Sequence, residues 1–324
     1  MPMAVPESDD ALRPLVKNEL LRWVGNGDSL LETACLDALF PSGKLLRPTL
    51  CVESAKAVGG SHEHALAFAA GIECLHTASL VHDDIVDQDP VRRGRTSTAE
   101  QFGIAEALVA GDGLAMAGVA AMLSSGPADR ALEASRVMVD AMRHMCRATL
   151  RETELRGDLS CGVATVLDVI RGKTAALTGA ACEAGAILGG APPAQVSALR
   201  QYGERLGMAF QIRDDLLPYT VGDQVTGKTA VSDVANRQPT LPVLLAYESA
   251  EQPDRQRLTA VFRGTIDPIT AHHDVLDVVT RTGALIKAAE QARSYAERAR
   301  AELHGLAQAE RLTELAESAA ERRR

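Results

Sequence analysis

Three aspartates, Asp83, Asp84 and Asp87, close a long apolar stretch of the sequence, and Arg92 and Arg93 follow them within a few residues. On a helix Asp83 and Asp87 would share one face, where two like charges repel each other by about 0.2–0.5 kcal/mol. A helix also disfavours carboxylates at its negative C-terminal end. Mg²⁺ would explain them, because it binds one or two carboxylates together with waters and substrate phosphates. A solvated acidic helix end is the simpler alternative, but the neighbouring arginines favour a site for a metal-bound diphosphate.

A second acidic pair, Asp214 and Asp215, ends another apolar helical segment far away in the sequence. Two such helix ends can face each other across one helical bundle and hold metal ions between them. We therefore expect two or three Mg²⁺ ions that neutralise a diphosphate and turn it into a leaving group. Lys173, Lys228 and Arg92 are the cations expected at the rim, above apolar walls that keep water from a carbocation.

Lys44 and Arg47 begin a helix and lie on the same face of it, directly after the Pro41-Ser-Gly turn. Cations are disfavoured at the positive end of a helix dipole, so an anionic ligand would explain them. His76 lies among apolar residues before the first aspartates. It is either a core histidine with a satisfied hydrogen bond or a donor to a phosphate.

The composition favours an all-α fold. The 324 residues are 46% hydrophobic but only 3% aromatic, and strands prefer aromatic and β-branched residues. Helical spacing predicts helices at 63–86, 97–123, 129–159, 162–188 and 193–217, and four or five more after residue 243. Pro218 should end the helix at 193–217 near Leu217. With no strand pattern, linker or repeat, residues 1–324 are interpreted as one all-α domain, a helical bundle with a central cavity.

Charge and cysteine usage bear on partners and location. The net charge of −9 argues against nucleic acid or an anionic membrane as a partner. The six cysteines are scattered without a Cys-x-x-Cys motif, as expected in a reducing cytoplasm. We see neither a signal peptide nor a run of 18 apolar residues, so we expect no membrane span.

Five short motifs occur in an order that resembles the trans-isoprenyl diphosphate synthases of the polyprenyl synthetase family, and geranylgeranyl diphosphate synthases among them. They are Gly43-Lys-Leu-Leu-Arg-Pro48, Leu80–Thr96, Lys173-Thr174, Phe210-Gln211 and Asp214-Asp215. The resemblance covers about residues 40 to 245. It implies the isoprenoid-synthase helical bundle, a homodimer, and a head-to-tail condensation of an allylic diphosphate with isopentenyl diphosphate.

The resemblance also implies roles for individual residues. Isopentenyl diphosphate would be bound by Lys44, Arg47, His76 and Arg93. Magnesium would be held by Asp83, Asp87 and Asp214, with Asp84 and Asp215 beside them. The allylic diphosphate would be bound by Arg92, Lys173, Thr174, Gln211 and Lys228.

The sequence departs from the family pattern at two positions. Pro218 stands where the family usually has the last aspartate of its second motif, and Gln238, beside Arg237, stands where a lysine is usual. The site therefore loses a negative charge and, unless Arg237 compensates, a positive one. The two interpretations are compensation within the site and an altered activity.

Product length is predicted from the residues one turn below Asp83. Ala78 and Ser79 are small there, and no bulky aromatic residue blocks elongation as in short-chain members of the family. We expect a product longer than fifteen carbons, with geranylgeranyl diphosphate favoured and longer products left open. The predicted tunnel runs between the helices at 63–86 and 97–123, with Leu75 and Met116 as its floor.

Two alternatives remain open. A class I terpene cyclase of the same fold would ionise an allylic diphosphate, but the sequence lacks an Asn-Asp-x-x-Ser-x-x-x-Glu motif and has few aromatic residues for cation–π contacts. A non-catalytic subunit of a heteromeric synthase would not need an intact Asp83-Asp84-x-x-Asp87 motif.

Overall fold

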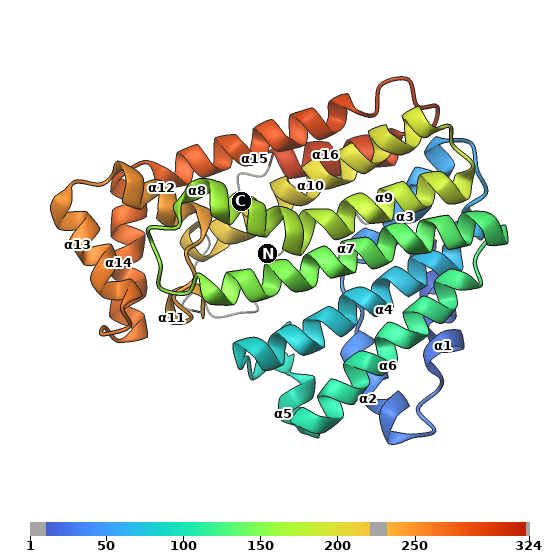
Figure 1. Cartoon of the computed structure of the whole chain (residues 1–324), viewed down its shortest axis with the longest axis horizontal. Coiled ribbons are helices and arrows are strands. Elements are labelled where there is room, and N and C mark those ends of the chain that lie inside the picture. The colour runs from blue at the N-terminus through green and yellow to red at the C-terminus, as the bar shows by residue number, and fades with distance from the viewer. Residues whose placement is uncertain (1–10, 221–231, 322–324) are drawn as a thin grey trace.

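The computed structural model describes residues 11–220 and 232–321, and it confirms the all-α architecture (Figure 1). The first half of the chain forms α1 (Leu12–Val24), α2 (Leu30–Leu39), α3 (Leu46–Ala57), α4 (His62–Asp87), α5 (Thr98–Phe102), α6 (Ile104–Leu123) and α7 (Ala128–Glu154). Next come α8 (Gly162–Ile170), the π-helical turn η1 (Arg171–Ala175), α9 (Ala176–Gly189) and α10 (Pro193–Thr220). The remaining helices are α11 (Ser232–Ala235), α12 (Leu241–Ser249), α13 (Gln252–Phe262), α14 (Pro268–Arg281), α15 (Ala284–Ala301) and α16 (Glu310–Glu321).

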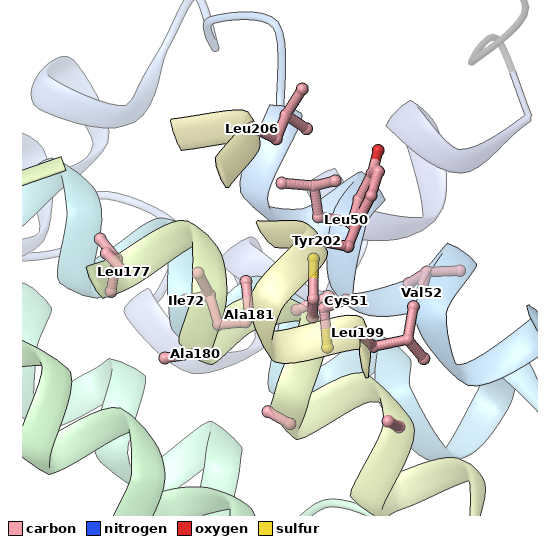
Figure 2. Packing of buried hydrophobic residues seen from close by; sticks show 14 of the residues in the cluster. Leu50, Cys51, Val52, Ile72, Leu177, Ala180, Ala181, Leu199, Tyr202 and Leu206 are labelled. Atoms are coloured by element: carbon pink, nitrogen blue, oxygen red, sulfur yellow. The ribbon is translucent and has the colours of Figure 1, made fainter. Parts of the chain in front are cut away.

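The centre of the bundle is built from small residues that let helices approach closely. Helix α9 packs against α3, α7 and α10. Figure 2 shows Tyr202 of α10 beside Leu50 and Cys51 of α3. A Cβ atom on Gly185 of α9 would lie 2.1 Å from the carbonyl oxygen of Cys51, so no larger residue fits there. The low aromatic content thus corresponds to close helix packing, as the composition predicts.

The last helices cover the end of the bundle where the acidic motifs lie. Residues of α12 to α15 form a second buried cluster with Ile212 and Leu216 of α10. The C-terminal ends of α4, α7 and α10 point toward this same end, near α11 (Figure 1). Chain segments far apart in sequence therefore converge on one place, although the interpretation of residues 1–324 as a single domain stays a prediction.

Three predicted helix boundaries are wrong. The helix expected at 129–159 ends earlier, at Glu154, so Arg156 lies outside it. The helix expected at 97–123 is broken at Gly103, whose φ of +105° suits glycine and separates α5 from α6. Helix α10 continues through Pro218 to Thr220. Proline removes one backbone donor there, the N–H that would bond to the carbonyl of residue 214, but the Tyr219 ring stabilises the last turn by stacking on His272 of α14 with centroids 5.9 Å apart.

A short hairpin departs from the expectation that the chain has no strands. Its strands β1 (Val91–Arg92) and β2 (Arg95–Thr96) pair antiparallel around Arg93-Gly94. Arg93 has φ +53° and Gly94 has φ +74°, as in a two-residue type I′ turn. Two-residue strands are too short to leave an alternating sequence pattern.

By length and hydropathy alone, α4 and α6 could each cross a membrane. In α4, 67% of the apolar window is buried inside the chain, as in the core helix of a globular protein, but in α6 the buried share is 33%. Helix α4 is therefore buried like a core helix, whereas α6 has an exposed apolar face, and the absence of a membrane span stays a prediction.

Candidate active site

Each of the three aspartates at the end of α4 faces a cation from a different segment. Asp83 lies 3.2 Å from the Nζ atom of Lys173 in η1. Asp84 accepts a hydrogen bond of 2.7 Å from Nε of Arg92 in β1, and Asp87 accepts one from Arg156, just after α7. The cluster is therefore held together by tertiary ion pairs that offset the repulsion between the carboxylates.

Lys173 lies at the centre of these contacts because it comes from a π-helical turn between α8 and α9. Its ammonium group also pairs with Glu152 of α7. Burial by itself would lower the pKa of Lys173, but the charges of Glu152 and Asp83 outweigh it and raise the pKa. Burial raises the pKa of Glu152, and its pairing with Lys173 counteracts that effect. Lys173 is therefore a firmly protonated cation between α4 and α7.

The next residue connects the first acidic motif to the second. The Thr174 hydroxyl donates to the Gln211 side-chain oxygen at 2.7 Å, and the Gln211 amide nitrogen donates to Asp215 at 2.9 Å. Burial raises the pKa of Asp215 to about 8, although the Gln211 hydrogen bond opposes the shift. Its neighbour Asp214 is exposed. Through Lys173 and Thr174, η1 thus reaches both acidic helix ends.

The expected basic residues also gather in one place. Nη1 of Arg47 lies 3.0 Å from Nε2 of His76. Burial, and then the charges of Arg47 and Arg93, lower the pKa of His76 well below its ordinary value. A neutral His76 therefore accepts from Arg47 and is not a free-standing cation. A Cβ atom on Gly43 would lie 2.9 Å from Nη2 of Arg93, so the glycine leaves room for that guanidinium.

Backbone strain marks the start of α3. Leu45 caps this helix with φ +53°, a left-handed conformation that leucine rarely adopts. The strained residue is held by burial, since its side chain is only 4% exposed. The turn presents Lys44 and Arg47 at the positive end of α3, where an anion would be stabilised.

The two arginines after the first motif are separated by the hairpin. Arg92 turns back to Asp84, and this contact raises the pKa of Arg92 against the opposing effect of burial. Arg93 is exposed at the tip of the turn. The hairpin thus directs the side chain of Arg92 toward the α4 carboxylates and that of Arg93 toward Gly43.

At Gly71 and Gly118 the helices α4 and α6 leave no room for the tunnel predicted between them. A Cβ atom on Gly118 of α6 would lie 2.7 Å from the carbonyl oxygen of Gly71 in α4, so the backbones touch. Ala78 is 2% exposed and packs in a cluster with residues of α2 and α6, whereas Leu75 belongs to the central cluster with residues of α7 and α9. Met116 is 64% exposed on α6, which contradicts its expected place on the tunnel floor of the same chain.

Four residues near the site were not expected or cannot be placed. Glu73 is 3% exposed and faces Arg93 and Arg47, while burial raises its pKa. A lone carboxyl in the apolar run before His76 was the signal that could have revealed it. Glu152 in the last turn of α7 and Arg156 just after this helix lie in a charged segment and leave no distinguishing pattern in the sequence. Lys228 lies outside the described residues.

The carboxylates of the two acidic helix ends are the candidate ligands of a hard divalent cation. Within residues 11–220 and 232–321, no three His, Cys, Asp or Glu side chains converge closely enough to hold a metal by themselves. Asp83 and Asp87 do share one helix face, and Asp214 is exposed on α10. Such a set fits Mg²⁺, which takes one or two carboxylates and completes its octahedron with waters and phosphate oxygens.

Comparison with known proteins agrees with this geometry. The polyprenyl synthetase family model matches residues 28–279. A short chain isoprenyl diphosphate synthase from Methanothermobacter thermautotrophicus is 37% identical over 242 residues, which is 75% of this chain and 74% of the relative. Other relatives are named for products from farnesyl to nonaprenyl diphosphate, so similarity alone does not choose a product length.

Solved structures show the same fold. Geranylgeranyl pyrophosphate synthetase from Pyrococcus horikoshii superposes with a TM-score of 0.89 at 30% identity, over 96% of each chain. A polyprenyl synthase from Caulobacter crescentus, complexed with calcium and isoprenyl diphosphate, gives a TM-score of 0.91 at 29% identity, over 99% of this chain and 97% of that one. The chain therefore belongs to the polyprenyl synthetase family and is an isoprenyl diphosphate synthase, a prenyltransferase with the all-α fold of that family.

Proposed function

We propose that the enzyme condenses an allylic diphosphate with isopentenyl diphosphate in a Mg²⁺-dependent, head-to-tail reaction. The observation that carries this proposal is the bridge made by η1. Lys173 contacts Asp83 on α4, and Thr174 reaches Asp215 on α10 through Gln211. A diphosphate between the two helix ends would therefore meet carboxylates, a lysine and a hydroxyl at the same place.

The two substrates would occupy the two sets of cations. Isopentenyl diphosphate is assigned to the basic residues Lys44, Arg47, His76 and Arg93. The allylic diphosphate is assigned to Arg92, Lys173, Thr174, Gln211 and Lys228. Bound Mg²⁺, two or three ions on Asp83, Asp87 and Asp214, would stabilise the charge of the departing diphosphate. A related synthase crystallised with calcium and isoprenyl diphosphate supports a divalent cation beside this ligand.

In this reaction the carbon–oxygen bond of the allylic diphosphate breaks and a carbon–carbon bond forms to isopentenyl diphosphate. The cation formed in this way then loses a proton to the released diphosphate, which leaves the double bond of the product. Lys173, which stays protonated, holds the leaving group, while the apolar central cluster that contains Leu75 excludes water from the cation. Neutral His76 orients Arg47 toward the second diphosphate.

We propose geranylgeranyl diphosphate as the main product. Because α4 and α6 touch at Gly71 and Gly118, the growing chain is assigned to the edge of α4 that borders the central cluster, where Leu75, Ser79 and Asp83 are successive residues at four-residue spacing. Ser79 leaves space one turn below Asp83, and its hydroxyl is satisfied by the carbonyl of His76 at 2.7 Å. Leu75 is the first large side chain below it.

The exposed face of α6 supports a homodimer. Ile104, Leu108 and Met116 are 62%, 45% and 64% exposed, and an apolar patch of this kind usually marks an interface. We propose that a second copy covers it, which also accounts for the membrane-like hydropathy of α6 in a cytoplasmic enzyme. Met116→Lys together with Leu108→Asp should convert the dimer to a monomer by light scattering, and an unchanged mass would reject this interface.

One incubation tests the proposed function against its two alternatives. The protein is given farnesyl diphosphate and Mg²⁺, with and without isopentenyl diphosphate, and the products are identified. The synthase forms a longer diphosphate only when isopentenyl diphosphate is present. A hydrocarbon formed without isopentenyl diphosphate would indicate a class I terpene cyclase, and no product under either condition would favour a non-catalytic subunit.

A further inference from the structure

Arg156 contacts the α4 carboxylates, although neither the motifs nor the family resemblance assigns it a role. It follows the C-terminal residue pair Glu154-Leu155 of α7 and donates through Nη2 to Asp87. Its side chain is 23% exposed, so most of it is withdrawn from water. A cation placed only to complement the α7 dipole would need no such burial.

The backbone around Arg156 is fixed from several sides. Gly157 donates its N–H to the carbonyl of Arg237 at 2.8 Å. A Cβ atom on Gly157 would lie 2.9 Å from the carbonyl of Phe262, and the φ of +83° also suits glycine. Leu155 and Leu159 are buried on either side, at 4% and 7% exposure. The direction of Arg156 is therefore set by the fold, not by a flexible loop.

The guanidinium of Arg156 uses only half of its binding edge. Nη2 bonds to Asp87, but the adjacent Nε is buried and has no hydrogen-bond partner. An Nε–Nη2 edge matches two oxygens of one phosphate group. A buried N–H without an acceptor is costly, so this donor points to an acceptor that arrives with a ligand.

Asp87 is also a proposed metal ligand, which determines what happens to Arg156 when the site fills. A divalent cation on Asp87 would take over its oxygens and repel the guanidinium. The nearest new anion would be the diphosphate that accompanies the metal. We propose that Arg156 is a diphosphate-binding residue that exchanges Asp87 for phosphate oxygens as the substrate enters; this inference rests on the proposed function.

The test is equilibrium binding of inorganic pyrophosphate in saturating Mg²⁺, measured by calorimetry on the full chain. Arg156→Gln should weaken pyrophosphate binding by about 10- to 100-fold, since bonds between charged groups are lost. Arg156→Lys keeps the positive charge but lacks the paired N–H donors of a guanidinium. Its affinity for pyrophosphate should lie between those of the wild type and Arg156→Gln. Arg151→Gln is the matched control, because Arg151 lies on the last turn of α7, is 54% exposed and pairs with Glu154; this variant should bind pyrophosphate like the wild type.

The opposite result is equally well defined. If Arg156 only neutralises Asp87, Arg156→Gln frees that carboxylate, and pyrophosphate then binds equally well or more tightly; this outcome overturns the proposal. Should Arg156→Gln fail to fold by circular dichroism, Arg156→Lys decides, and wild-type affinity in that variant also overturns it. The proposed function is judged separately: a wild-type protein that binds pyrophosphate but forms no prenyl product would reject the synthase and leave the Arg156 result standing.

Discussion

At the end of α4, the carboxylates of Asp83, Asp84 and Asp87 face Lys173, Arg92 and Arg156, whereas at the end of α10, Asp215 faces the amide of Gln211 and Asp214 is exposed. Both ends carry an Asp-Asp pair, but α4 keeps its negative charge by ion pairing and α10 reduces it by burying a carboxyl whose pKa is raised to about 8. The comparison indicates that α4 supplies most of the charge for binding metal and diphosphate. A third carboxylate at position 218 would then add little.

The largest expected effect tests the α4 side of this comparison. Asp83→Ala and Asp87→Ala should each lower turnover by about 100-fold or more, because loss of metal stabilisation is worth several kcal/mol. Steady-state turnover at saturating Mg²⁺ is the measurement, with exposed Asp129→Ala in the first turn of α7 as the control. Near-wild-type rates in both site variants would remove the metal assignment on α4.

Asp214→Ala should also be severe, because Asp214 is the exposed carboxylate of the α10 pair. The same assay compares it directly with the α4 variants. If Asp214→Ala retained wild-type turnover, the second metal-binding helix end would have to be assigned to other residues.

The next effect concerns product length, which is assigned to the residues of α4 below its carboxylates. No residue of α10 is given this role. Ser79→Phe should shift the main product from twenty toward fifteen carbons, as the ring would fill the space between Asp83 and Leu75. Ala78→Phe is the neighbouring control: it would enter the packed cluster with α2 and α6, and should lower the melting temperature without shifting the product. A product shift with Ala78→Phe but not with Ser79→Phe would reverse this assignment.

A smaller effect tests the buried carboxyl of α10. The pKa of Asp215 is raised from 3.8 to about 8, so between these values the folded protein holds a proton that the unfolded chain releases. The contribution of Asp215 to the free energy of unfolding therefore falls as the pH rises from 3.8 to about 8, by at most about 1.4 kcal/mol per pH unit. Asn cannot ionise, so Asp215→Asn lacks this loss of stability. Without metal, the melting temperature of Asp215→Asn relative to that of the wild type should therefore rise between pH 5 and pH 8.

Exposed Glu290→Gln controls for the loss of a carboxylate in general. It should follow the pH dependence of the wild-type protein. Parallel melting curves for Asp215→Asn and the wild type would mean that Asp215 is already ionised in the folded protein at low pH.

The smallest expected effect is that of Pro218→Asp. Helix α10 already continues past this position, so the substitution restores one backbone donor and adds a carboxylate at the helix end. Turnover should stay close to that of the wild type. A large gain would show that the natural site is impaired, and would strengthen the alternative of a non-catalytic subunit.

The sequence predicted the all-α fold and the helix that carries Asp83 because apolar spacing and motif order are local signals. It failed where tertiary contacts decide the outcome. Pro218 was expected to end α10, but the stacking of Tyr219 on His272 holds one more turn. Arg156 was missed because a charged residue at a helix end looks the same whether it faces solvent or a carboxylate on another helix.

The path of the tunnel also depends on tertiary contacts. Small residues at Gly71 and Gly118 are compatible with either an open channel or close contact between helices. Only the structure shows that the two backbones touch. Residue size therefore predicts product length only when the face of α4 that each residue occupies is known.

The π-helical turn η1 makes the spacing of this part of the chain as important as its composition. A π turn holds one residue more than a regular turn of α-helix, so the residues before and after it are rotated relative to each other. Removing a single residue between Arg171 and Ala175 would turn Lys173 away from Asp83 or Thr174 away from Gln211, even though every motif residue was retained. Insertions and deletions within this turn should consequently be far less tolerated than substitutions on its exposed side.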